Sequence, residues 1–545
     1  MTDSACLFSI VVPVFNTDPV FLNECISSVL DQDFADWELL LVDDASTRDE
    51  SRGVLETAER LDSRVRVVRR SDNGGIVAAS NTALSMACGD WLVLVDHDDA
   101  LEPTALSEIK AAIDRFPDVD YVYTDEFHLH PDGTAVEFKK PDWSPERFRC
   151  QMYTCHISAI RRSLSEEIGG FRAGFDGAQD YDYVLRVVER ARAVHHIRKP
   201  LYYWRVNPTS FSQVGETRNK SFEAGRSAVE QHCSRVGINA TVVHGDAPGV
   251  YRLERKYDGY PRVSIIVPTR GSDAIVWGRN TTPVLDCLRE IRTKSTYQNF
   301  EYVVVADATT PHHVIADLQQ LLGSDLVLVA YDKPFNFSDK VNLGATHSTS
   351  DYLLLLNDDT LIINRDWFEP MLALIQQDGV GTVGNMLLFE DSRLQCAGHM
   401  FVEGNPTHVS FKDPSHDGGF ASINFVDREV SGNTGACLLV RRDTYFSVGG
   451  LSLTFGNNYN DVDFALKLSR KGLRHLWTPQ SKMFHFESLT RDPTVTGSEL
   501  SNLHDRWSIE LHDERWAFPA EWDFNHIPPR KLTFRRQWKP RLLNA

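Results

Sequence analysis

The chain has 545 residues, of which 42% are hydrophobic and 24% are charged, as is ordinary for globular proteins. This composition excludes a wholly disordered, collagenous or fibrous protein, and the length allows three or four domains or two larger ones. The 57 basic and 76 acidic side chains give a formal net charge of −19, so we expect no nucleic-acid partner, since binding to phosphates needs a basic surface.

The start of the chain and its cysteines indicate a cytoplasmic protein. No basic region precedes the first apolar run, so we expect no signal peptide. The longest apolar runs, 91–95 and 352–356, are far shorter than the ~20 residues of a membrane helix. The nine cysteines form no CxxC pair, and their odd number favours reduced thiols over a disulfide framework or a zinc site.

The first elements form a predicted βαβ unit. Residues 9–14 are a β-branched, strand-like run, residues 21–30 carry apolar side chains at helical spacing, and residues 38–42 are another strand-like run. This order and spacing predict a parallel sheet that helices cover on both faces. Ligands of such sheets bind at the carboxyl ends of the strands, so the residues after each strand are the first candidates for a site.

Carboxylates follow two of the predicted strands. Asp44 comes after the strand at 38–42, and the run DHDD at 96–99 comes after the strand at 91–95. An Asp in the first place could accept a hydrogen bond from a base or a ribose, or it could cap a turn or a helix. Carboxylates gathered at one strand end repel one another unless a cation neutralises them, and a divalent cation shared with a diphosphate would do so. We therefore expect a metal–diphosphate site there rather than exposed turn carboxylates.

An internal repeat divides the chain. Five blocks of the first half recur in the second half in the same order: 9–13 at 264–268, 40–46 at 303–309, 81–98 at 342–359, 161–171 at 441–451, and 180–182 at 461–463. Chance matches would not keep this order, so we expect two homologous domains, with a surface-loop insertion in the second near 413–422.

The repeat sets the expected architecture. We predict an α/β protein with two Rossmann-like domains in tandem, each with a mainly parallel central sheet. The first domain is expected at 1–245 and the second at 246–500, with a C-terminal extension at 501–545. Glycines and prolines between residues 245 and 261 are typical of the linker that would join the two domains.

Two further acidic residues recur at equivalent places. Asp180 and Asp461 each follow a Gly-Gly block and open a helix-like run. An acidic residue in a first helical turn can simply favour the helix dipole, or it can serve as a general base that deprotonates an attacking hydroxyl. His485 follows a strand-like run at 473–478, where a lone histidine is more often structural than a ligand.

In order and spacing, these blocks resemble the family 2 glycosyltransferases with a GT-A fold. In the first copy the resemblance is carried by SIVVPVFN at 9–16, VDDAS at 42–46, NGG at 73–75, SN at 80–81, LVDHDD at 94–99 and QDYD at 179–182. In the second copy it is carried by FNFS at 335–338, KVNLG at 340–344, LNDDT at 356–360, NTGA at 433–436 and NDVD at 460–463. The resemblance covers about residues 8–215 and 262–490 and implies two GT-A domains in tandem. Chains of this kind resemble bacterial enzymes that build O-antigen, capsule or other surface polysaccharides, including rhamnose-containing ones.

The resemblance also implies a reaction. It is the inverting transfer of a hexosyl or deoxyhexosyl group from a UDP-, dTDP- or GDP-sugar to a saccharide or polyprenyl-linked acceptor. The implied cofactor is Mg²⁺ or Mn²⁺, which stabilises charge on the departing nucleoside diphosphate. Asp180 and Asp461 match the catalytic base, and Asp98, Asp359 and His485 match metal ligands. The residues that match nucleotide-sugar contacts are Pro13, Asp44, Asn73, Asn81, Asp96, Pro268, Asp307, Lys340, Asn342 and Asp358.

Departures from the pattern leave two hypotheses open. Ala306 stands where the first copy has Asp43, and Asn357 stands where it has Asp96. Arg205 opens the stretch of the first copy where the family's late histidine is expected. Either both domains are transferases that add successive sugars, or one is active beside a degenerate scaffold or acceptor-binding domain.

Three other classes fit the sequence less well. A dinucleotide oxidoreductase needs a GxGxxG turn after its first strand, where this chain has PVFN at 13–16. A sugar nucleotidyltransferase would have a glycine-rich basic loop there to bind a triphosphate. A non-catalytic carbohydrate-binding protein would not need carboxylates gathered at a diphosphate edge.

The last residues are basic and aromatic. Segment 530–545 holds six Lys or Arg side chains and no acidic one, with Phe534 and Trp538 between them. This pattern predicts either peripheral contact with the anionic inner face of the cytoplasmic membrane or docking on the chain's own acidic domains.

Overall fold

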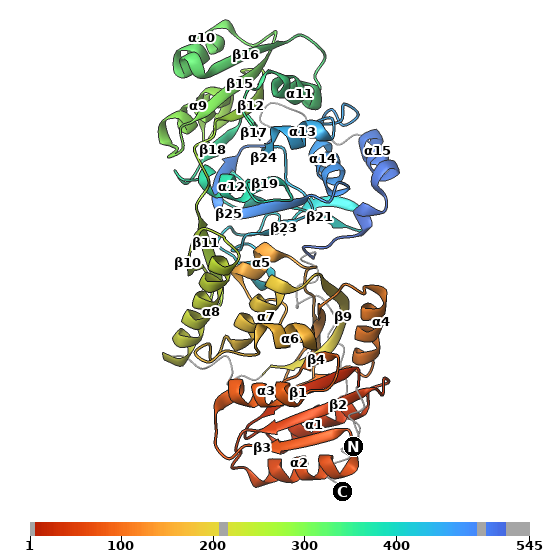
Figure 1. Ribbon diagram of the computed structural model, residues 1–545. Coiled ribbons are helices and arrows are strands. Elements are labelled where there is room, and N and C mark those ends of the chain that lie inside the picture. The colour runs from red at the N-terminus through yellow and green to blue at the C-terminus, as the bar shows by residue number, and fades with distance from the viewer. Residues whose placement is uncertain (1–5, 207–215, 488–496, 519–545) are drawn as a thin grey trace. The chain divides into compact units, whose positions relative to one another are not determined.

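The computed structural model describes residues 6–206, 216–487 and 497–518 (Figure 1). Contacts divide the described chain into two compact units. Unit 1 contains residues 6–143 and 151–238, and unit 2 contains Ser144–Cys150 together with 239–518. The predicted domain limits near 245 and 500 stay predictions, and the basic segment 530–545 lies outside the described residues.

Unit 1 is built on a nine-stranded, mostly parallel sheet of order β3-β2-β1-β4-β8-β6-β9-β5, with β7 added beside β6. Neighbouring strands from β3 to β4 are parallel, whereas β8 is antiparallel to both of its neighbours. The strands are β1 (Phe8–Val14), β2 (Trp37–Asp43), β3 (Val65–Arg69), β4 (Trp91–Leu94), β5 (Ala100–Leu101), β6 (Tyr121–Leu129), β7 (Ala135–Phe138), β8 (Ser158–Arg161) and β9 (Val194–Arg205). The helices are α1 (Pro19–Leu30), α2 (Asp49–Leu61), α3 (Gly75–Met86), α4 (Ala105–Arg115), α6 (Arg162–Ile168), α7 (Gln179–Arg190) and α8 (Glu216–Arg235).

Unit 2 repeats the order of the first eight strands and has a ten-stranded sheet. Its main sheet runs β16-β15-β12-β17-β24-β19-β25-β18, and β20 and β23 pair with β19 and β25. The strands of the main sheet are β12 (Val263–Thr269), β15 (Phe300–Asp307), β16 (Leu326–Tyr331), β17 (Tyr352–Leu356), β18 (Thr360–Ile362), β19 (Val380–Leu388), β20 (Leu394–Cys396), β23 (Arg428–Val430), β24 (Cys437–Arg441) and β25 (Arg474–His485). The helices are α5 (Pro145–Cys150), α9 (Pro283–Lys294), α10 (His312–Leu322), α11 (Phe337–His347), α12 (Phe368–Ile375), α13 (Arg442–Ser447), α14 (Asn460–Ser469) and α15 (Gly497–Trp507).

Three two-stranded hairpins lie outside the main sheets. They are β10 (Ala240–His244) with β11 (Tyr251–Arg255), β13 (Ala274–Val276) with β14 (Arg279–Thr281), and β21 (His399–Val402) with β22 (Asn405–His408). The predicted insertion near 413–422 does lie outside regular strands, but the extra residues of unit 2 also build the β21–β22 hairpin. Between β7 and β8, the corresponding stretch of unit 1, the described residues form no such hairpin.

The local sequence explains where the first elements begin and end. β1, α1 and β2 cover the predicted strand, helix and strand. Pro19 opens α1, where its missing N–H costs nothing, and the side chain of Asp18 caps the helix by accepting the N–H of Val20. The local sequence therefore fixes the start of α1 by two features, the proline at its first turn and the aspartate before it.

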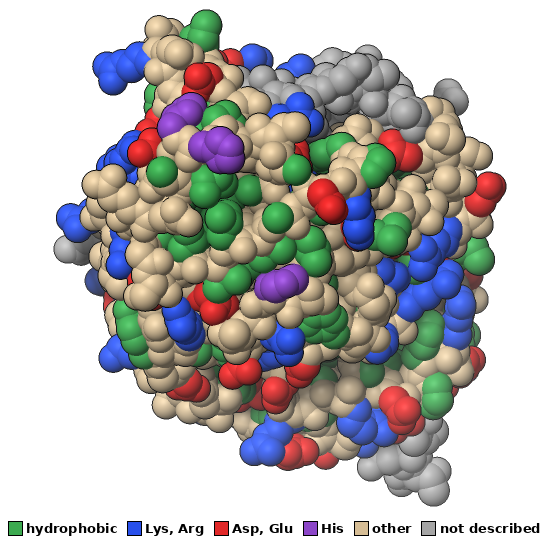
Figure 2. Space-filling model, turned by 90° about the horizontal axis from the view of Figure 1, so that it is seen from above, with side chains coloured by type: hydrophobic (Ala, Val, Ile, Leu, Met, Phe, Trp, Pro, Cys, Tyr) green, Lys and Arg blue, Asp and Glu red, His purple; other side chains and the backbone are tan. Residues whose placement is uncertain are grey.

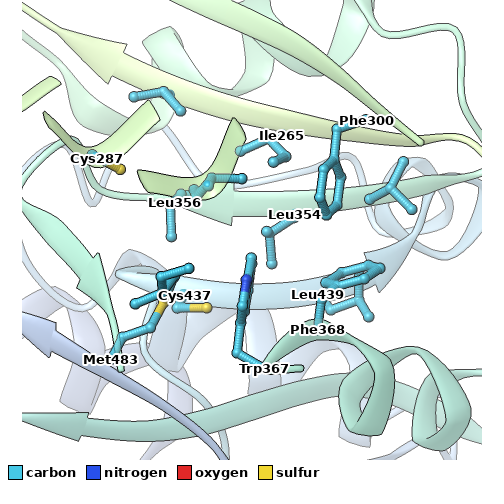
Figure 3. Close-up of a cluster of buried hydrophobic side chains, with 14 of the residues drawn as sticks. Ile265, Cys287, Phe300, Leu354, Leu356, Trp367, Phe368, Cys437, Leu439 and Met483 are labelled. Atoms are coloured by element: carbon cyan, nitrogen blue, oxygen red, sulfur yellow. The ribbon is translucent and has the colours of Figure 1, made fainter. Parts of the chain in front are cut away.

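Alternating side chains of a central strand pack into two separate hydrophobic cores, one on each face of the sheet. Ile265 and Ile266 are neighbours on β12, yet Ile265 packs with residues of α9, α10 and α12, and Ile266 packs with residues of α11, α13 and α14. This is the two-faced burial expected of a parallel sheet. Figure 3 shows the first of these cores, where Trp367 and Phe368 lie against Leu354 and Leu439.

The cysteines are reduced thiols in this structure. No disulfide joins the nine cysteines, all of which are described. Among the helices of the described chain, none combines the length and apolar character that a membrane span requires. On the face shown in Figure 2, Asp and Glu side chains are interspersed with Lys and Arg, so this face is not one acidic patch.

Candidate functional site

In unit 1 the carboxylate after β2 accepts hydrogen bonds from the segment that joins β3 to α3. Asp44 is buried, and its oxygens accept hydrogen bonds from Arg70 Nε at 2.8 Å, from Gly74 N–H at 3.0 Å and from Gly75 N–H at 2.7 Å. Asn73 Oδ1 also faces the Gly75 N–H, at 3.2 Å. Asp44 and Asn73 therefore both shape the turn that leads into α3.

The equivalent carboxylate of unit 2 has a different cation. Lys340, from α11, is buried, and its Nζ donates to Asp307 Oδ1 at 2.7 Å and to the Thr269 carbonyl at 3.0 Å. Arg270 Nε lies 3.9 Å from the other oxygen of Asp307. The sequence thus neutralises the same position with an arginine in one copy and a helical lysine in the other.

Asn81 and Asn342 make the same backbone contact in the two units. Asn81 exchanges two hydrogen bonds of 2.9 Å with the backbone of Phe171, and Asn342 bonds the backbone of Leu451 at 2.8 and 2.9 Å. Gly170, which has a φ of 69°, leaves room for this contact, since a Cβ there would lie 2.7 Å from Asn81 Oδ1. These amides link α3 and α11 to the Gly-Gly blocks, and their contact with a nucleotide-sugar stays a prediction.

The acidic run after β4 contacts a histidine that the sequence did not single out. His156 Nε2 lies 3.2 Å from Asp96 Oδ2. Burial would lower the pKa of His156, but Asp96 and Asp99 raise it to about 9. Asp96 and His156 line a cavity of about 90 Å³ together with Pro13 and with Asp180, which lies in the first turn of α7. Desolvation and the charge of Asp96 raise the pKa of Asp180 to about 6.

The last residue of β9 completes the acidic edge of unit 1. Arg205 Nε donates to the carbonyl of Asp98 at 2.8 Å, and its backbone N–H donates to Asp99 Oδ1 at 2.7 Å. The equivalent strand of unit 2, β25, ends at His485. A guanidinium therefore supplies positive charge in unit 1 at the strand end where unit 2 offers an imidazole.

In unit 2 the acidic run meets that imidazole. His485 Nε2 lies 3.2 Å from Asp359 Oδ1 and 3.1 Å from Asn357 Nδ2. Asp358 accepts a hydrogen bond from the Thr269 hydroxyl, and desolvation together with Asp359 raises its pKa to about 7. Pro268, Lys340, Asp358, Asp359 and His485 line one cavity of about 80 Å³.

A larger cavity of about 280 Å³ adjoins the first, because Phe337, Asn357, His485 and Glu487 line both. Asp461 lines this larger cavity from the first turn of α14. Its Oδ2 accepts the Gly435 N–H at 3.0 Å, and its Oδ1 accepts the Val462 N–H at 2.9 Å. Desolvation opposes ionisation, but His399 and these backbone donors outweigh it and lower the pKa of Asp461.

Both copies of the repeat match one known protein family. The family described as Glycosyl transferase family 2 matches residues 9–169 and 264–446, once in each copy. The chain belongs to glycosyl transferase family 2.

Relatives in this glycosyltransferase family share both copies. The chain is 38% identical over 520 residues to the uncharacterized protein y4gI of Sinorhizobium fredii, covering 94% of this chain and 56% of that one. It is 34% identical over 491 residues to the O-antigen biosynthesis protein RfbC of Myxococcus xanthus, covering 89% and 38%. The chain thus spans about half the length of these relatives or less.

Among solved structures, that of S. aureus TarS 1–349 in complex with UDP-GlcNAc is similar over 41% of this chain and 65% of that chain. The sequence identity is 23% and the TM-score is 0.35. The fold of this chain is mixed α/β, with mostly parallel central sheets in two tandem regions.

The donor atoms at the edge of the sheet in unit 2 suit a divalent cation. Gln395 Oε1 accepts the Nδ1–H of His485 at 2.6 Å, which leaves the Nε2 lone pair to accept the Asn357 amide N–H at 3.1 Å, beside Asp359 Oδ1 at 3.2 Å. This outer hydrogen bond is the pattern that orients metal-binding histidines. Beside it, Asn357 Oδ1 is a buried oxygen with no hydrogen-bond partner among the described residues. A carboxylate and an imidazole therefore lie side by side in unit 2, next to the residue that carries this unsatisfied oxygen.

Sequence reasoning missed three residues of these candidate sites: His156, Gln395 and His399. None lies in a block that recurs between the copies, and each meets its partner only through the tertiary fold. Gln395 and His399 both lie shortly before the insertion near 413–422, and the presence of that insertion in only one copy was a signal that this region differs.

Proposed function

We propose that this chain is a metal-dependent, inverting glycosyltransferase that moves a sugar from a nucleotide-sugar to a saccharide acceptor in polysaccharide synthesis, and that unit 2 carries out the transfer. The observation that carries the proposal is the ionised carboxylate of Asp461 at a cavity that adjoins Asp359 and His485. The printed names of its relatives, an O-antigen biosynthesis protein and a hyaluronan synthase of Pasteurella multocida (30% identical over 237 residues, 43% of this chain and 24% of that one), support this class of product.

The smaller cavity of unit 2 is proposed to hold the donor. Lys340 would place a buried positive charge beside the nucleotide, while Asp307 and Asp358 would accept hydrogen bonds from its base and ribose. Asp359 and His485 would hold Mg²⁺ or Mn²⁺, which when bound neutralises charge on the departing diphosphate. The donor nucleotide is proposed to be UDP, dTDP or GDP.

The larger cavity is proposed to hold the acceptor, which is a saccharide or a polyprenyl-linked saccharide. Asp461 is the general base in this proposal: it takes the proton of the attacking acceptor hydroxyl, and its lowered pKa leaves it ionised at neutral pH. A single displacement by that hydroxyl inverts the anomeric carbon. The backbone donors of Gly435 and Val462 hold the carboxylate in place.

Unit 1 is a second candidate, either as a transferase that adds another sugar or as a scaffold that binds the acceptor. Asp180 would be its base, with Asp96 and Pro13 on the donor side and Asp98 as the metal ligand. Two observations favour the scaffold: the ion pair of Asp96 with His156, and Arg205 in place of a late histidine.

A donor screen tests the proposal. Purified protein is incubated with UDP-, dTDP- and GDP-sugars, with Mg²⁺, Mn²⁺ or EDTA, and release of nucleoside diphosphate is measured with and without oligosaccharide acceptors. We expect release from one nucleotide class, dependence on the cation and stimulation by an acceptor. Binding of saccharide without any release would instead indicate a non-catalytic carbohydrate-binding protein.

A further inference from the structure

The hairpin that distinguishes unit 2 from unit 1 stands beside Asp461. His399 is the first residue of β21 and His408 is the last residue of β22, and the two are paired across the hairpin. Their rings lie 5.2 Å apart, centroid to centroid, and both line the 280 Å³ cavity with Asp461. We propose that the β21–β22 hairpin supports the general base of unit 2 and that His399 is a positioning residue for Asp461. This inference rests on the proposed function.

The geometry of His399 is that of a side chain aimed at one carboxylate. The residue is only 3% exposed, and its Nε2 lies 3.9 Å from Asp461 Oδ2. Its Nδ1 is buried and has no hydrogen-bond partner among the described residues. Leaving a buried polar atom unsatisfied costs about 1–3 kcal/mol, so an imidazole kept in this place needs a compensating role.

The protonation of His399 suits that role. Burial lowers its pKa, so the ring is neutral at pH 7 and carries one N–H. With that proton on Nε2, the ring would direct an N–H at Asp461 and stabilise the carboxylate without forming a permanent ion pair. The distance of 3.9 Å is longer than a hydrogen bond, and such contacts commonly tighten only when the substrate is bound.

The remaining contacts of Asp461 leave room for this partner. Its carboxylate accepts one backbone N–H on each oxygen, from Gly435 and Val462, and Oδ2 keeps a second lone pair on the side of His399. His408, from β22, lowers the pKa of Asp461, whereas His475, from β25, acts on His399. His485 and the acidic Glu487 line the same cavity. The pKa of Asp461 is lowered even so.

In unit 1, where the described residues form no such hairpin, the pKa of the equivalent carboxylate shifts the other way. Asp180 occupies the equivalent helical turn, and desolvation together with the charge of Asp96 raises its pKa to about 6. His156 opposes that rise but pairs with Asp96 rather than with Asp180. The surroundings of the two carboxylates therefore differ in two ways: unit 1 has Asp96 where unit 2 has the uncharged Asn357, and only unit 2 has His399 beside its base.

Two substitutions at one position separate positioning from packing. His399→Gln keeps a side-chain N–H that can reach Asp461, whereas His399→Phe keeps a buried ring and removes the donor. The matched control is His475→Gln, which alters another buried histidine of unit 2 whose bonds go to Thr382, Ser469 and the Ala465 carbonyl. The kcat, the KM for the donor and the pH profile of kcat are measured for each with the nucleotide-sugar found in the donor screen.

For His399→Phe we expect kcat to fall by about tenfold, a fraction of the 10²–10⁴ that a general base supplies. The donor KM should stay within about twofold of its original value, since His399 does not line the donor cavity. The acid limb of the profile should move to higher pH, because Asp461 loses a group that lowers its pKa. His399→Gln should keep most of kcat, and His475→Gln should leave the limb in place.

Two results would overturn the inference. An unmoved acid limb in His399→Phe would make His399 a packing residue, and so would an equal shift in His475→Gln. The proposed function fails separately: if Asp461→Asn keeps full transfer activity, Asp461 is not the base, and the role of His399 falls with it. If Asp461→Asn is inactive and the limb of His399→Phe does not move, only this inference is wrong.

Discussion

At the scale of single residues, buried charges in this protein are kept where a partner of opposite charge meets them. Glu126 on β6 is 4% exposed, and Lys140, 1% exposed, donates to its Oε2 at 2.7 Å and to the Thr154 carbonyl at 2.7 Å. Burial would raise the pKa of Glu126, but Lys140 and His128 lower it to about 2. The ion pair is thus coupled to folding of unit 1.

Glu126→Gln tests this coupling. It should lower the free energy of unfolding of unit 1 by about 3–5 kcal/mol at pH 7, because Lys140 is left as a buried charge without its counterion. The folded pKa lies below that of an ordinary Glu, so the pair stabilises the fold above pH ~4.5, and this stability is lost as the pH falls towards 2. Urea unfolding between pH 2 and pH 7 measures both effects.

The control for this prediction is Glu137→Gln on β7. Glu137 lies 3.8 Å from Lys139, and both side chains are partly exposed. Exposed pairs of this kind contribute about 0–1 kcal/mol. Equal losses of stability in the two variants would contradict the account of the buried pair.

At the scale of elements, α5 shows how a short helix can belong to a distant part of the sequence. It lies between β7 and β8 in the chain, yet it packs in unit 2. Glu146 on α5 forms ion pairs with Arg255 of β11 and, at 2.6 Å, with Arg149. Arg474 of β25 lies 3.7 Å from the same carboxylate. A helix from the first copy therefore supplies a buried charge to the core of the second unit.

Glu146→Gln should destabilise unit 2 by about 3 kcal/mol or more, because Arg255 is nearly buried and would lose its counterion. Thermal unfolding followed by circular dichroism would show a lower transition temperature for unit 2. Glu290→Gln on α9 is the comparison, since it removes an exposed helical pair with Lys294 that should be worth only about 0.5 kcal/mol. A Glu146→Gln transition at the wild-type temperature would show that α5 is not part of the core of unit 2.

At the scale of the whole molecule, the sequence predicted the elements and motifs that recur in both copies, and it missed the tertiary contacts that do not recur. Apolar runs, helical spacing and recurring motifs predicted the first βαβ unit, the mainly parallel sheets, the carboxylates after β4 and β17, and the acidic turns of α7 and α14. The order of the strands within each sheet was not predicted. The placement of α5 and the contacts of His156, Gln395 and His399 could not be predicted in this way. They join residues that are far apart in sequence, and no local propensity encodes such a meeting.

The same contrast explains why the two copies differ. The shared blocks build the same sheet, but the strand end after β9 carries Arg205 where β25 carries His485, and only unit 2 has the β21–β22 hairpin among the described residues. Function in a repeated fold then depends on a few grafted side chains rather than on the architecture.

The most direct test of the central claim is the rate of transfer by Asp461→Asn, compared with Asp180→Asn and with Asp443→Asn, an exposed carboxylate of α13. Nucleoside diphosphate release and the oligosaccharide product are measured together in the presence of Mg²⁺ or Mn²⁺. We predict that Asp461→Asn loses about 100-fold or more in kcat, as removal of a general base requires, while Asp443→Asn keeps the full rate. Asp180→Asn should keep the transfer by unit 2 and lose at most a second product. Full transfer by Asp461→Asn would contradict the assignment of the base and of unit 2 as the active unit.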